Sequence, residues 1–453
     1  MIAVLTLVLC FGAQDPVERP PQVSKPPATS QKPSAQKPAR QTPATRKPAP
    51  AKNAPVGPAI AITNARILTA AGPAIAKGTI VIRGGTIVAV GANVSVPSGA
   101  TVVDAAGRIV TPGFIESNTN LGIVEIPLSA EGTADQNSTD PGVGAAFDVT
   151  DAFNPRSSAI PVARVDGITR ALVVPGGTGH LLQGQAAVFD LGGEFVPASV
   201  TKPRAVIMAA LGEAGAGVAG GSRATAMLRL RELLQDAIDF TRNRTAWTTG
   251  QRREYVRSRL DLEALRPVVT GAMPLAIQAN RASDLLAAMR LAEEFKLKLV
   301  LVGAAEGWMV ADELAKRQVP VVIKPLTNIP SFDALGATLE NAARLHKAGV
   351  TLVLSTFDTH RAGTLRQEVG NAVSYGLDPD AALRSVTITP AQVWGIADRT
   401  GSLEVGKDAD LVIWSGDPFE LTTAAEHVFI KGREMPMETR QTELLKKYRT
   451  ITR

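Results

Sequence analysis

The pattern of apolar and polar positions gives strand-like texture near both ends of the folded part of the chain. From 59 to 94, short runs alternate apolar and polar residues, with turn signals at 71–73 and 84–85. This alternation predicts a meander of short strands, each with one buried face. The apolar stretch within 104–117 does not alternate, which is typical of a strand buried on both faces of a parallel sheet. Strand texture returns at 401–435.

The middle of the chain repeats a short apolar strand followed by a longer polar or amphipathic segment. Such alternation over roughly 270 residues predicts an α/β barrel or a doubly wound sheet. The stretch at 222–267 is dense in Arg, Leu and Glu, and we interpret it as amphipathic helices with a solvated charged face. A further helix is predicted at 379–395. The predicted strands are Ala171–Val174, Ala205–Ala210, Leu275–Ala279, Leu299–Val302, Val319–Ile323 and Val350–Leu354, and the predicted helices between them are Ala282–Phe295, Trp308–Arg317 and Phe332–Ala348.

The first 58 residues lack this texture. Residues 1–13 form an apolar run of the length typical of a signal-peptide core, although no Lys or Arg precedes it. Residues 14–58 are rich in Pro, Ala, Lys, Gln and Ser and carry too few large apolar side chains to form a core, which indicates an extended linker. We therefore expect an exported protein, periplasmic or extracellular, with 1–13 as its signal peptide.

Composition and charge narrow the class of protein. The chain has 453 residues, of which 45% are hydrophobic and 20% charged, a globular profile. The net charge is +6, and 14–58 carries eight basic and two acidic residues, so the rest of the chain balances to zero. The folded part therefore offers no basic face for nucleic acid. The single cysteine, Cys10, excludes an intramolecular disulfide and a thiolate metal cluster.

Three segments, in the correct order, resemble the amidohydrolase superfamily. The segment at 111–117, TPGFIES, resembles the end of the first barrel strand, where a PGxIDxHxH pattern is typical. The segment at 382–396, ALRSVTITPAQVWGI, resembles the helix after the last barrel strand. The segment at 401–414, GSLEVGKDADLVIW, resembles the C-terminal sandwich strand. The resemblance covers 59–435, and the most similar branch is that of the imidazolonepropionase-like secreted amidohydrolases.

This resemblance implies an α/β fold, a TIM-like (β/α)8 barrel plus a small β-sandwich formed from N- and C-terminal segments. The implied barrel is 109–397, the composite sandwich takes 59–108 and 398–435, and 436–453 is a C-terminal tail. The implied activity is metal-dependent hydrolysis of carbon–nitrogen bonds in cyclic amides or small peptides. In that reaction a divalent ion activates water and an aspartate at the eighth strand acts as the base.

The positions at which the resemblance places the metal-binding histidines hold other residues. The HxH pair falls on Asn118 and Asn120, and the fifth-strand histidine falls on Gln278. The sixth-strand histidine falls on Val302 or Gly303. Imidazole is the preferred ligand of zinc-like ions, and neutral amides are weak substitutes. We therefore expect no metal site and no cofactor, with a weakly bound divalent metal left open.

Strand eight and the sparse histidines supply the catalytic candidates. The resemblance places the base at Asp358, with Phe357 as the alternative occupant of that position. His360 follows closely, and His180 lies in a Gly-rich loop, so both can reach the barrel mouth. Two histidines and one aspartate can form a facial ligand set, whereas ordinary polar contacts of loop histidines are the simpler interpretation. The remaining histidines are His346, on a predicted helix, and His427, in the sandwich.

Other polar side chains at predicted strand ends form a candidate binding site. Glu116 follows the first strand, Glu213 follows the strand at 205–210, and Lys324 ends a later strand. Such residues at the carboxyl ends of barrel strands serve a substrate or a hard cation, and the alternative is charge pairing that supports solubility and local structure. The substrate-binding candidates are Glu116, Asn118, Asn120, Glu213, Gln278 and Lys324.

Three functions stay open at this point. In the first, the chain is a carbon–nitrogen hydrolase with an unusual site, in which Asp358 is the base and His360 or His180 assists. In the second, it is a metal-free protein that binds a small molecule or small peptide. In the third, it is a non-catalytic subunit of an active amidohydrolase paralogue. Without the family histidines the standard metal-dependent mechanism is not expected. The expected partners are a small ligand and a homo-oligomer or hetero-oligomer, with no nucleic acid and no transmembrane span.

Overall fold

The computed structural model describes most of the second of two compact units into which the chain divides, Ala54–Arg453. The predicted signal peptide at 1–13 and nearly all of the predicted linker at 14–58 lie outside the described residues, so both stay predictions, as does export. Within the described part, every helix is too short or too polar to cross a bilayer. The described residues are 57–126, 134–176, 179–326 and 331–449.

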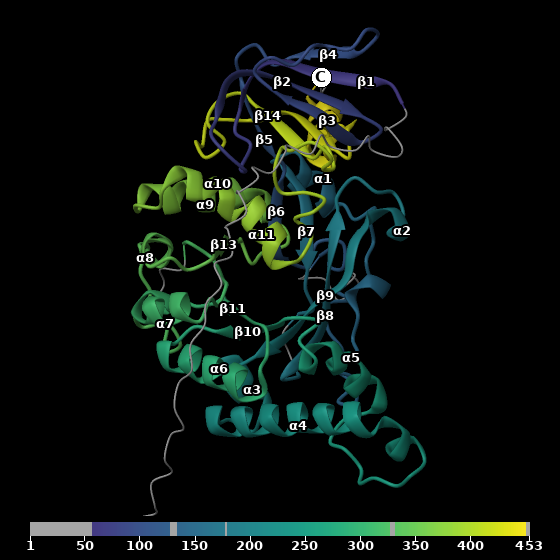
Figure 1. Cartoon of the computed structure of the whole chain (residues 1–453), viewed down its shortest axis with the longest axis vertical. Helices are drawn as coiled ribbons and strands as arrows, with labels where there is room; N and C mark the ends of the chain where they lie inside the picture. The colour runs from purple at the N-terminus through teal and green to yellow at the C-terminus, as the bar shows by residue number, and fades with distance from the viewer. Residues whose placement is uncertain (1–56, 127–133, 177–178, 327–330, 450–453) are drawn as a thin grey trace, which may run out of the picture. The chain divides into compact units, whose positions relative to one another are not determined.

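Segments from both ends of the described chain pair in one eight-stranded sheet, sheet A, in the order β16-β15-β14-β5-β1-β2-β3 with β4 paired to β1 (Figure 1). The two ends meet where Thr111 of β5 pairs antiparallel with Val412 of β14. The predicted sheet of N- and C-terminal segments is therefore confirmed. Its strands are β1 (Ala59–Ile67), β2 (Ile75–Arg83), β3 (Thr86–Gly91), β4 (Thr101–Asp104), β5 (Ile109–Pro112), β14 (Leu411–Trp414), β15 (Ala425–Ile430) and β16 (Arg433–Glu434).

The middle of the described chain forms a second eight-stranded sheet, sheet B, in the order β13-β12-β11-β10-β9-β8-β7-β6. It curves into a nearly closed barrel, and the predicted TIM-like fold is confirmed (Figure 1). The predicted strands recur, β10 with the predicted bounds and the others with shifted ends. The strands of sheet B are β6 (Phe114–Thr119), β7 (Ile168–Val173), β8 (Leu182–Asp190), β9 (Val200–Ala210), β10 (Leu275–Ala279), β11 (Leu299–Gly303), β12 (Val321–Ile323) and β13 (Leu352–Leu354).

Strand β8 departs from a regular barrel of parallel strands. It runs antiparallel to both β7 and β9, so β7, β8 and β9 form a meander with no helical crossover. The sequence pattern predicted no strand at 182–190, which was wrong. Gln183 lies inside β8 with 7% of its surface exposed. The physical reason is the apolar run at 186–189, which is fully buried between two strands. Burial of this apolar surface lowers the free energy of the fold more than an exposed loop would.

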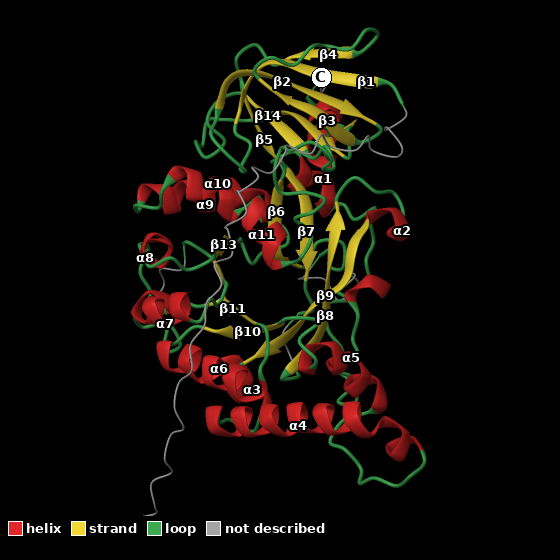
Figure 2. Cartoon of the chain, in the orientation of Figure 1, coloured by secondary structure: helices red, strands yellow, loops and turns green. Residues whose placement is uncertain are grey.

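The helices flank sheet B, as Figure 2 shows. Helix α6 (Ala282–Phe295) matches its prediction, because Leu285, Ala288, Met289 and Ala292 repeat at helical spacing and are buried. The other helices are α1 (Ala159–Arg164), α2 (Val196–Ser199), α3 (Gly212–Val218), α4 (Arg223–Thr248), α5 (Arg259–Val269), α7 (Ala311–Lys316), α8 (Asn341–Lys347), α9 (Leu365–Ser374), α10 (Pro379–Ser385), α11 (Ile388–Val393) and α12 (Arg440–Tyr448), with short 3-10 helices at Val149–Asp151, Gly307–Val310 and Ala362–Thr364.

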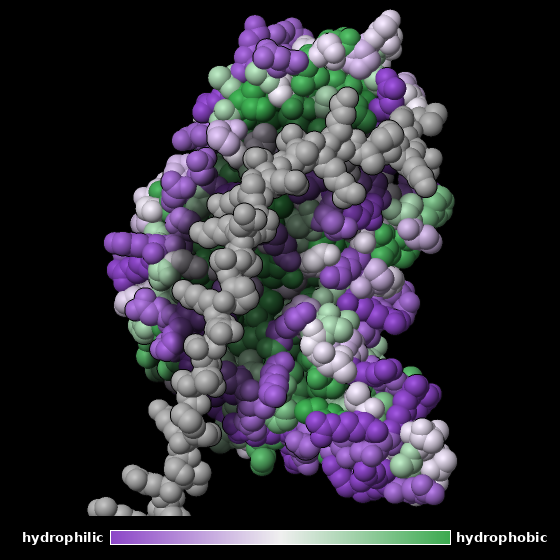
Figure 3. All heavy atoms as spheres, in the orientation of Figure 1, coloured by the Kyte–Doolittle hydropathy of each residue, from purple (hydrophilic) through white to green (hydrophobic). Residues whose placement is uncertain are grey.

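The predicted helix at 332–348 forms only in its second half. Its first half is an irregular segment held by tertiary hydrogen bonds, because Asp333 accepts from Arg223 and the Gly336 carbonyl accepts from the Trp308 indole at 2.8 Å. These partners outweigh local helix propensity. The helices predicted within 222–267 are present as α4 and α5, and Figure 3 shows hydrophilic side chains gathered over α4 and the segment that follows it.

The barrel interior is a packed apolar core. Alternate residues of the strands, among them Ile115, Val188 and Met208, pack against Trp394, which is 1% exposed. The Trp394 indole donates to the Ser117 hydroxyl of β6 at 3.2 Å. The residues directly before β10, β11 and β12 line one cavity with the end of α11, so α11 lies at the amino-terminal ends of these strands. Trp394 directly follows α11 and therefore enters the barrel from that end. Ligand chemistry is therefore confined to the strand ends and the loops.

Candidate functional site

Glu116 closes the barrel between its two edge strands, β6 and β13. Its side chain is fully buried and accepts hydrogen bonds from the Ser355 hydroxyl, from the Thr356 backbone N–H at 3.1 Å and from the Thr356 hydroxyl at 3.0 Å. Burial raises the pKa of Glu116 to about 7, although these hydrogen bonds favour the ionised form. Because no part of its surface is exposed, Glu116 does not face a ligand. It instead holds the first and last barrel strands together.

The HxH positions at the end of β6 hold two asparagines, whose side chains differ in their hydrogen bonding. Asn120 is fixed in place, because its Nδ2 donates to the Val174 carbonyl at 2.7 Å and its backbone N–H donates to the Thr359 hydroxyl at 3.2 Å. Asn118 is half-buried, and its side chain makes no hydrogen bond among the described residues. The Gln278 side chain on β10 is half-buried and equally unpaired within the described residues. Asn118 and Gln278 therefore have amide groups available for a ligand.

In the segment after β13, the Asp358 carboxylate is held by Arg361, three residues further along the chain. The Asp358 carboxylate accepts from the Arg361 backbone N–H at 3.0 Å and from its guanidinium at 3.2 Å. Partial burial would raise the pKa of Asp358, but the Arg361 contacts outweigh it and hold the pKa below its usual value. Phe357 has a φ of +53°, an uncommon conformation for a bulky residue, and packs against the apolar barrel core. Phe357, rather than Asp358, thus faces the interior.

The two candidate histidines, His180 and His360, lie in different environments. The exposed His360 donates through Nε2 to the Glu125 carbonyl at 2.7 Å. His180 lines a pocket with α3 and α4, and its buried Nε2 has no hydrogen-bond partner among the described residues. Within the described ranges, no three His, Cys, Asp or Glu side chains are grouped so that they could hold a metal ion.

Glu213 and Lys324 both take part in ion pairs beyond the carboxyl ends of the strands. Lys324 lies 4.0 Å from Glu368, whose pKa is raised by burial. Glu213 lies in the first turn of α3 and pairs with Arg223 at 3.1 Å. Arg223 also contacts Asp284 at 3.0 Å and Asp333 at 2.7 Å. The sequence interpretation missed this cluster, because its members come from four separate segments and only their charge types are visible in the sequence.

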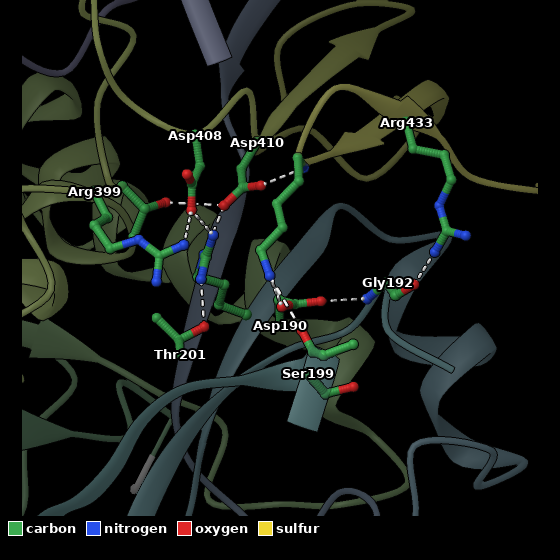
Figure 4. Close-up of polar contacts among 12 residues, drawn as sticks. Asp190, Gly192, Ser199, Thr201, Arg399, Asp408, Asp410 and Arg433 are labelled. Carbon is green, nitrogen blue, oxygen red and sulfur yellow. Dashed lines mark hydrogen bonds and ion pairs between the residues drawn. The ribbon is translucent and has the colours of Figure 1, made fainter. Parts of the chain in front are cut away.

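A buried polar network lies elsewhere, where sheet A meets sheet B (Figure 4). Arg170 of β7 is fully buried and contacts Asp410 at 2.6 Å and Asp408 at 2.7 Å. Lys431 donates through its backbone to Asp410 at 2.8 Å and through its ammonium to Asp190 at 2.6 Å. Each of these carboxylates has cationic or N–H donors. The network therefore joins the two sheets, which indicates a structural role.

Comparisons with known proteins agree with this geometry. The model of the Amidohydrolase family matches residues 275–435. The curated Amidohydrolase tasK of Hapsidospora irregularis is 25% identical over 366 residues, which are 74% of this chain and 37% of that protein. An Imidazolonepropionase of Erwinia tasmaniensis is 42% identical over 62 residues, 14% of each chain. The chain thus spans well under half the length of these curated relatives in the matched regions.

Solved structures extend the likeness over the whole described fold. A crystal structure of an amidohydrolase from Thermotoga maritima MSB8 superimposes with a TM-score of 0.76 at 29% identity. The match covers 83% of this chain and 99% of that one. Molinate hydrolase superimposes with a TM-score of 0.53 at 18% identity over 84% of this chain and 95% of its own, which is a likeness of fold.

Proposed function

Because the chain belongs to the amidohydrolase superfamily, we propose that its barrel mouth binds a small molecule or short peptide with a carbon–nitrogen bond, without the superfamily's histidine-held metal. The observation that carries this proposal is the pair of unpaired amides, Asn118 and Gln278, at two positions where the resemblance places metal-binding histidines. A primary amide offers both donors and an acceptor, which complement the N–H and C=O of an amide ligand.

The donor set at the mouth does not fit a zinc-like ion. The Asn120 amide already donates to Val174, and the Asp358 carboxylate is held by Arg361. His360 uses its Nε2 for the Glu125 carbonyl, which leaves only Nδ1. Zinc prefers imidazole and thiolate ligands in a tetrahedral set, and the described mouth residues offer amides in their place. The proposal therefore assigns ligand binding, not metal-activated hydrolysis, to this surface.

Hydrolysis of a carbon–nitrogen bond is the second candidate, favoured by the 29% identity to the Thermotoga maritima amidohydrolase over nearly its whole length. Asp358 would be the base, with His360 or His180 assisting. A base with a pKa below its usual range removes a proton poorly at neutral pH. Hydrolysis through Asp358 is therefore expected to be slow. Assembly with an active paralogue stays a prediction.

The test combines metal content, binding and turnover on the purified chain after exhaustive dialysis. We expect far less than one metal per chain, binding of dipeptides or cyclic amides by calorimetry, and little turnover. Asn118→Ala and Gln278→Ala should each weaken binding by about tenfold, the effect of one or two lost hydrogen bonds. Gln251→Ala, at an exposed position after α4, is the matched control. Stoichiometric metal with metal-dependent hydrolysis would overturn the proposal and favour the second candidate.

A further inference from the structure

We propose that a pocket beside the barrel, between residues 179–181 and helices α3 and α4, binds a small organic carboxylate with an aliphatic body. The pocket has a volume of about 490 Å³, within the range of small-molecule sites. Figure 1 shows α3 and α4 below the strands of sheet B. This site is separate from the amides of the barrel mouth, and the inference does not depend on the proposed function.

The pocket walls combine apolar side chains with a fixed backbone. Leu181, Val218 and Leu233 contribute aliphatic surface from three different segments. The Leu181 carbonyl accepts from the Ala210 backbone N–H at 2.9 Å, which ties the histidine-bearing segment to the end of β9. A preformed wall of this kind lowers the ordering cost of binding.

The polar groups of the pocket are all suited to an anion. The described lining contains no Asp or Glu, but it contains His180, Thr225, Arg229 and Arg257. The Arg257 guanidinium donates to the Pro141 carbonyl and has no carboxylate partner among the described residues. A guanidinium presents several N–H donors and retains the capacity to bind a carboxylate.

His180 supplies an independent sign of a missing partner. Its Nε2 is buried, and no described residue hydrogen-bonds to it, while the residue itself lines the pocket. A buried polar atom without a partner costs free energy, and a ligand oxygen accepting from the Nε2–H would remove that cost. A carboxylate bound to Arg257 would also accept from His180 once the imidazole turns its Nε2–H toward the pocket, while its aliphatic body contacts Leu181, Val218 and Leu233.

Substitutions at Arg257 and Arg231 allow the charge effect to be separated from a direct contact. Arg229 lines the pocket but already pairs with Glu232 at 2.7 Å. Arg231 is on the same helix, pairs with Glu294 at 2.8 Å and does not line the pocket. Arg257→Gln and Arg231→Gln therefore make the same change in net charge, one inside the site and one outside it.

The probe is N-acetyl-L-leucine, compared by calorimetry with N-acetyl-L-leucinamide, which has the same body but no charge. We expect the carboxylate to bind at least about tenfold more tightly, as charge-assisted hydrogen bonds require. Arg257→Gln should remove this preference, His180→Phe should reduce it, and Arg231→Gln should leave it within about twofold. Thermal unfolding of each variant shows that it is folded.

The carboxylate could belong to an acylated amino acid or to the C-terminus of a peptide, so Ala-Ala-Leu is the second probe. Tighter binding of either probe, lost in Arg257→Gln, supports the proposal and identifies the source. No binding of either carboxylate by the folded wild-type chain overturns it. Equal binding of the acid and the amide, or equal losses in Arg257→Gln and Arg231→Gln, also overturns it. Arg257 lines this pocket, whereas Asn118 and Gln278 do not. Binding that is lost in Arg257→Gln and kept in Asn118→Ala therefore belongs to this pocket, and binding with the opposite response belongs to the barrel mouth.

Discussion

The junction between sheets A and B and the carboxyl-terminal mouth of the barrel use polar residues in contrasting ways. At the junction, the fully buried Arg170 pairs with the buried Asp410 and the partly buried Asp408. At the mouth, Asn118 and Gln278 are half-buried, and their amides have no partner among the described residues. The first arrangement fixes two sheets in place, and the second leaves hydrogen-bonding capacity for a ligand.

This contrast teaches where substitutions should affect stability and where they should affect binding. A buried charge that loses its partners costs several kcal/mol, because the desolvation of the remaining charge is no longer offset. A half-buried amide that has no protein partner contributes little to folding. The following predictions rank the two regions by expected effect.

Arg170→Met should cause the largest loss of stability, about 3–5 kcal/mol, because it leaves Asp408 and Asp410 without their buried partner. Urea unfolding of the purified chain measures the change. Arg399→Met is the control, because Arg399 pairs with the same Asp408 at 3.0 Å but is 45% exposed. That control should cost below about 1 kcal/mol. Equal losses for the two variants would contradict a special role of the buried network.

Glu116→Gln should remove a pH dependence of stability. The pKa of Glu116 is raised to about 7 in the folded chain from 4.5, so the folded state binds the proton more tightly than the unfolded state. Its ionisation therefore lowers stability as pH rises from 4.5 to 7, by about 3 kcal/mol in total. The difference in unfolding free energy between Glu116→Gln and wild type should shift in favour of the variant from pH 5 to pH 8. A difference independent of pH would count against the buried acid.

Asn120→Ala and Asn118→Ala form a matched pair at the mouth. Asn120→Ala loses the hydrogen bond to Val174 and should cost about 1 kcal/mol. Asn118→Ala breaks no side-chain hydrogen bond among the described residues and should stay within about 0.5 kcal/mol of wild type. Denaturant midpoints compare the two variants directly. The reverse order would mean that Asn118, not Asn120, supports the end of β6.

Arg231→Gln should have the smallest effect, below about 0.5 kcal/mol. Arg231 is on the outer face of α4 and pairs with Glu294, and both side chains are more than 40% exposed. Thermal unfolding at low and high salt measures the contribution of the pair. A loss comparable with that of Arg170→Met would show that the charged face of α4 is structural rather than solvated.

The fold was predictable from the sequence where the apolar residues of a segment repeat at the spacing of a single type of secondary structure. Helix α6 was predicted to the residue because its apolar positions repeat at helical spacing without interruption. Strand β8 was missed because Gln183, Gly184 and Gln185 interrupt its first half and disguise the apolar run that follows. The helix predicted at 332–348 failed in its first half, because Asp333 is held by Arg223 from a distant segment.

The site was predictable only in position. Sequence motifs placed Asn118 and Asn120 at the end of the first barrel strand, where the structure has them. They could not show that Asn120 is fixed by Val174 while Asn118 is unpaired, nor that Phe357 faces the core. The partners of Arg170 are 238 and 240 residues away in the sequence, so no local pattern indicates them.

The antiparallel strand β8 has a consequence for the order of folding. The β7–β8–β9 meander pairs strands that are neighbours in the sequence, so its loops close at a small entropic cost. The barrel, in contrast, closes through Glu116 and Ser355, which are 239 residues apart. Local contacts form early and distant ones late, so the meander is expected to nucleate the barrel. Weakening the Glu116 closure should then speed unfolding while leaving the folding rate almost unchanged.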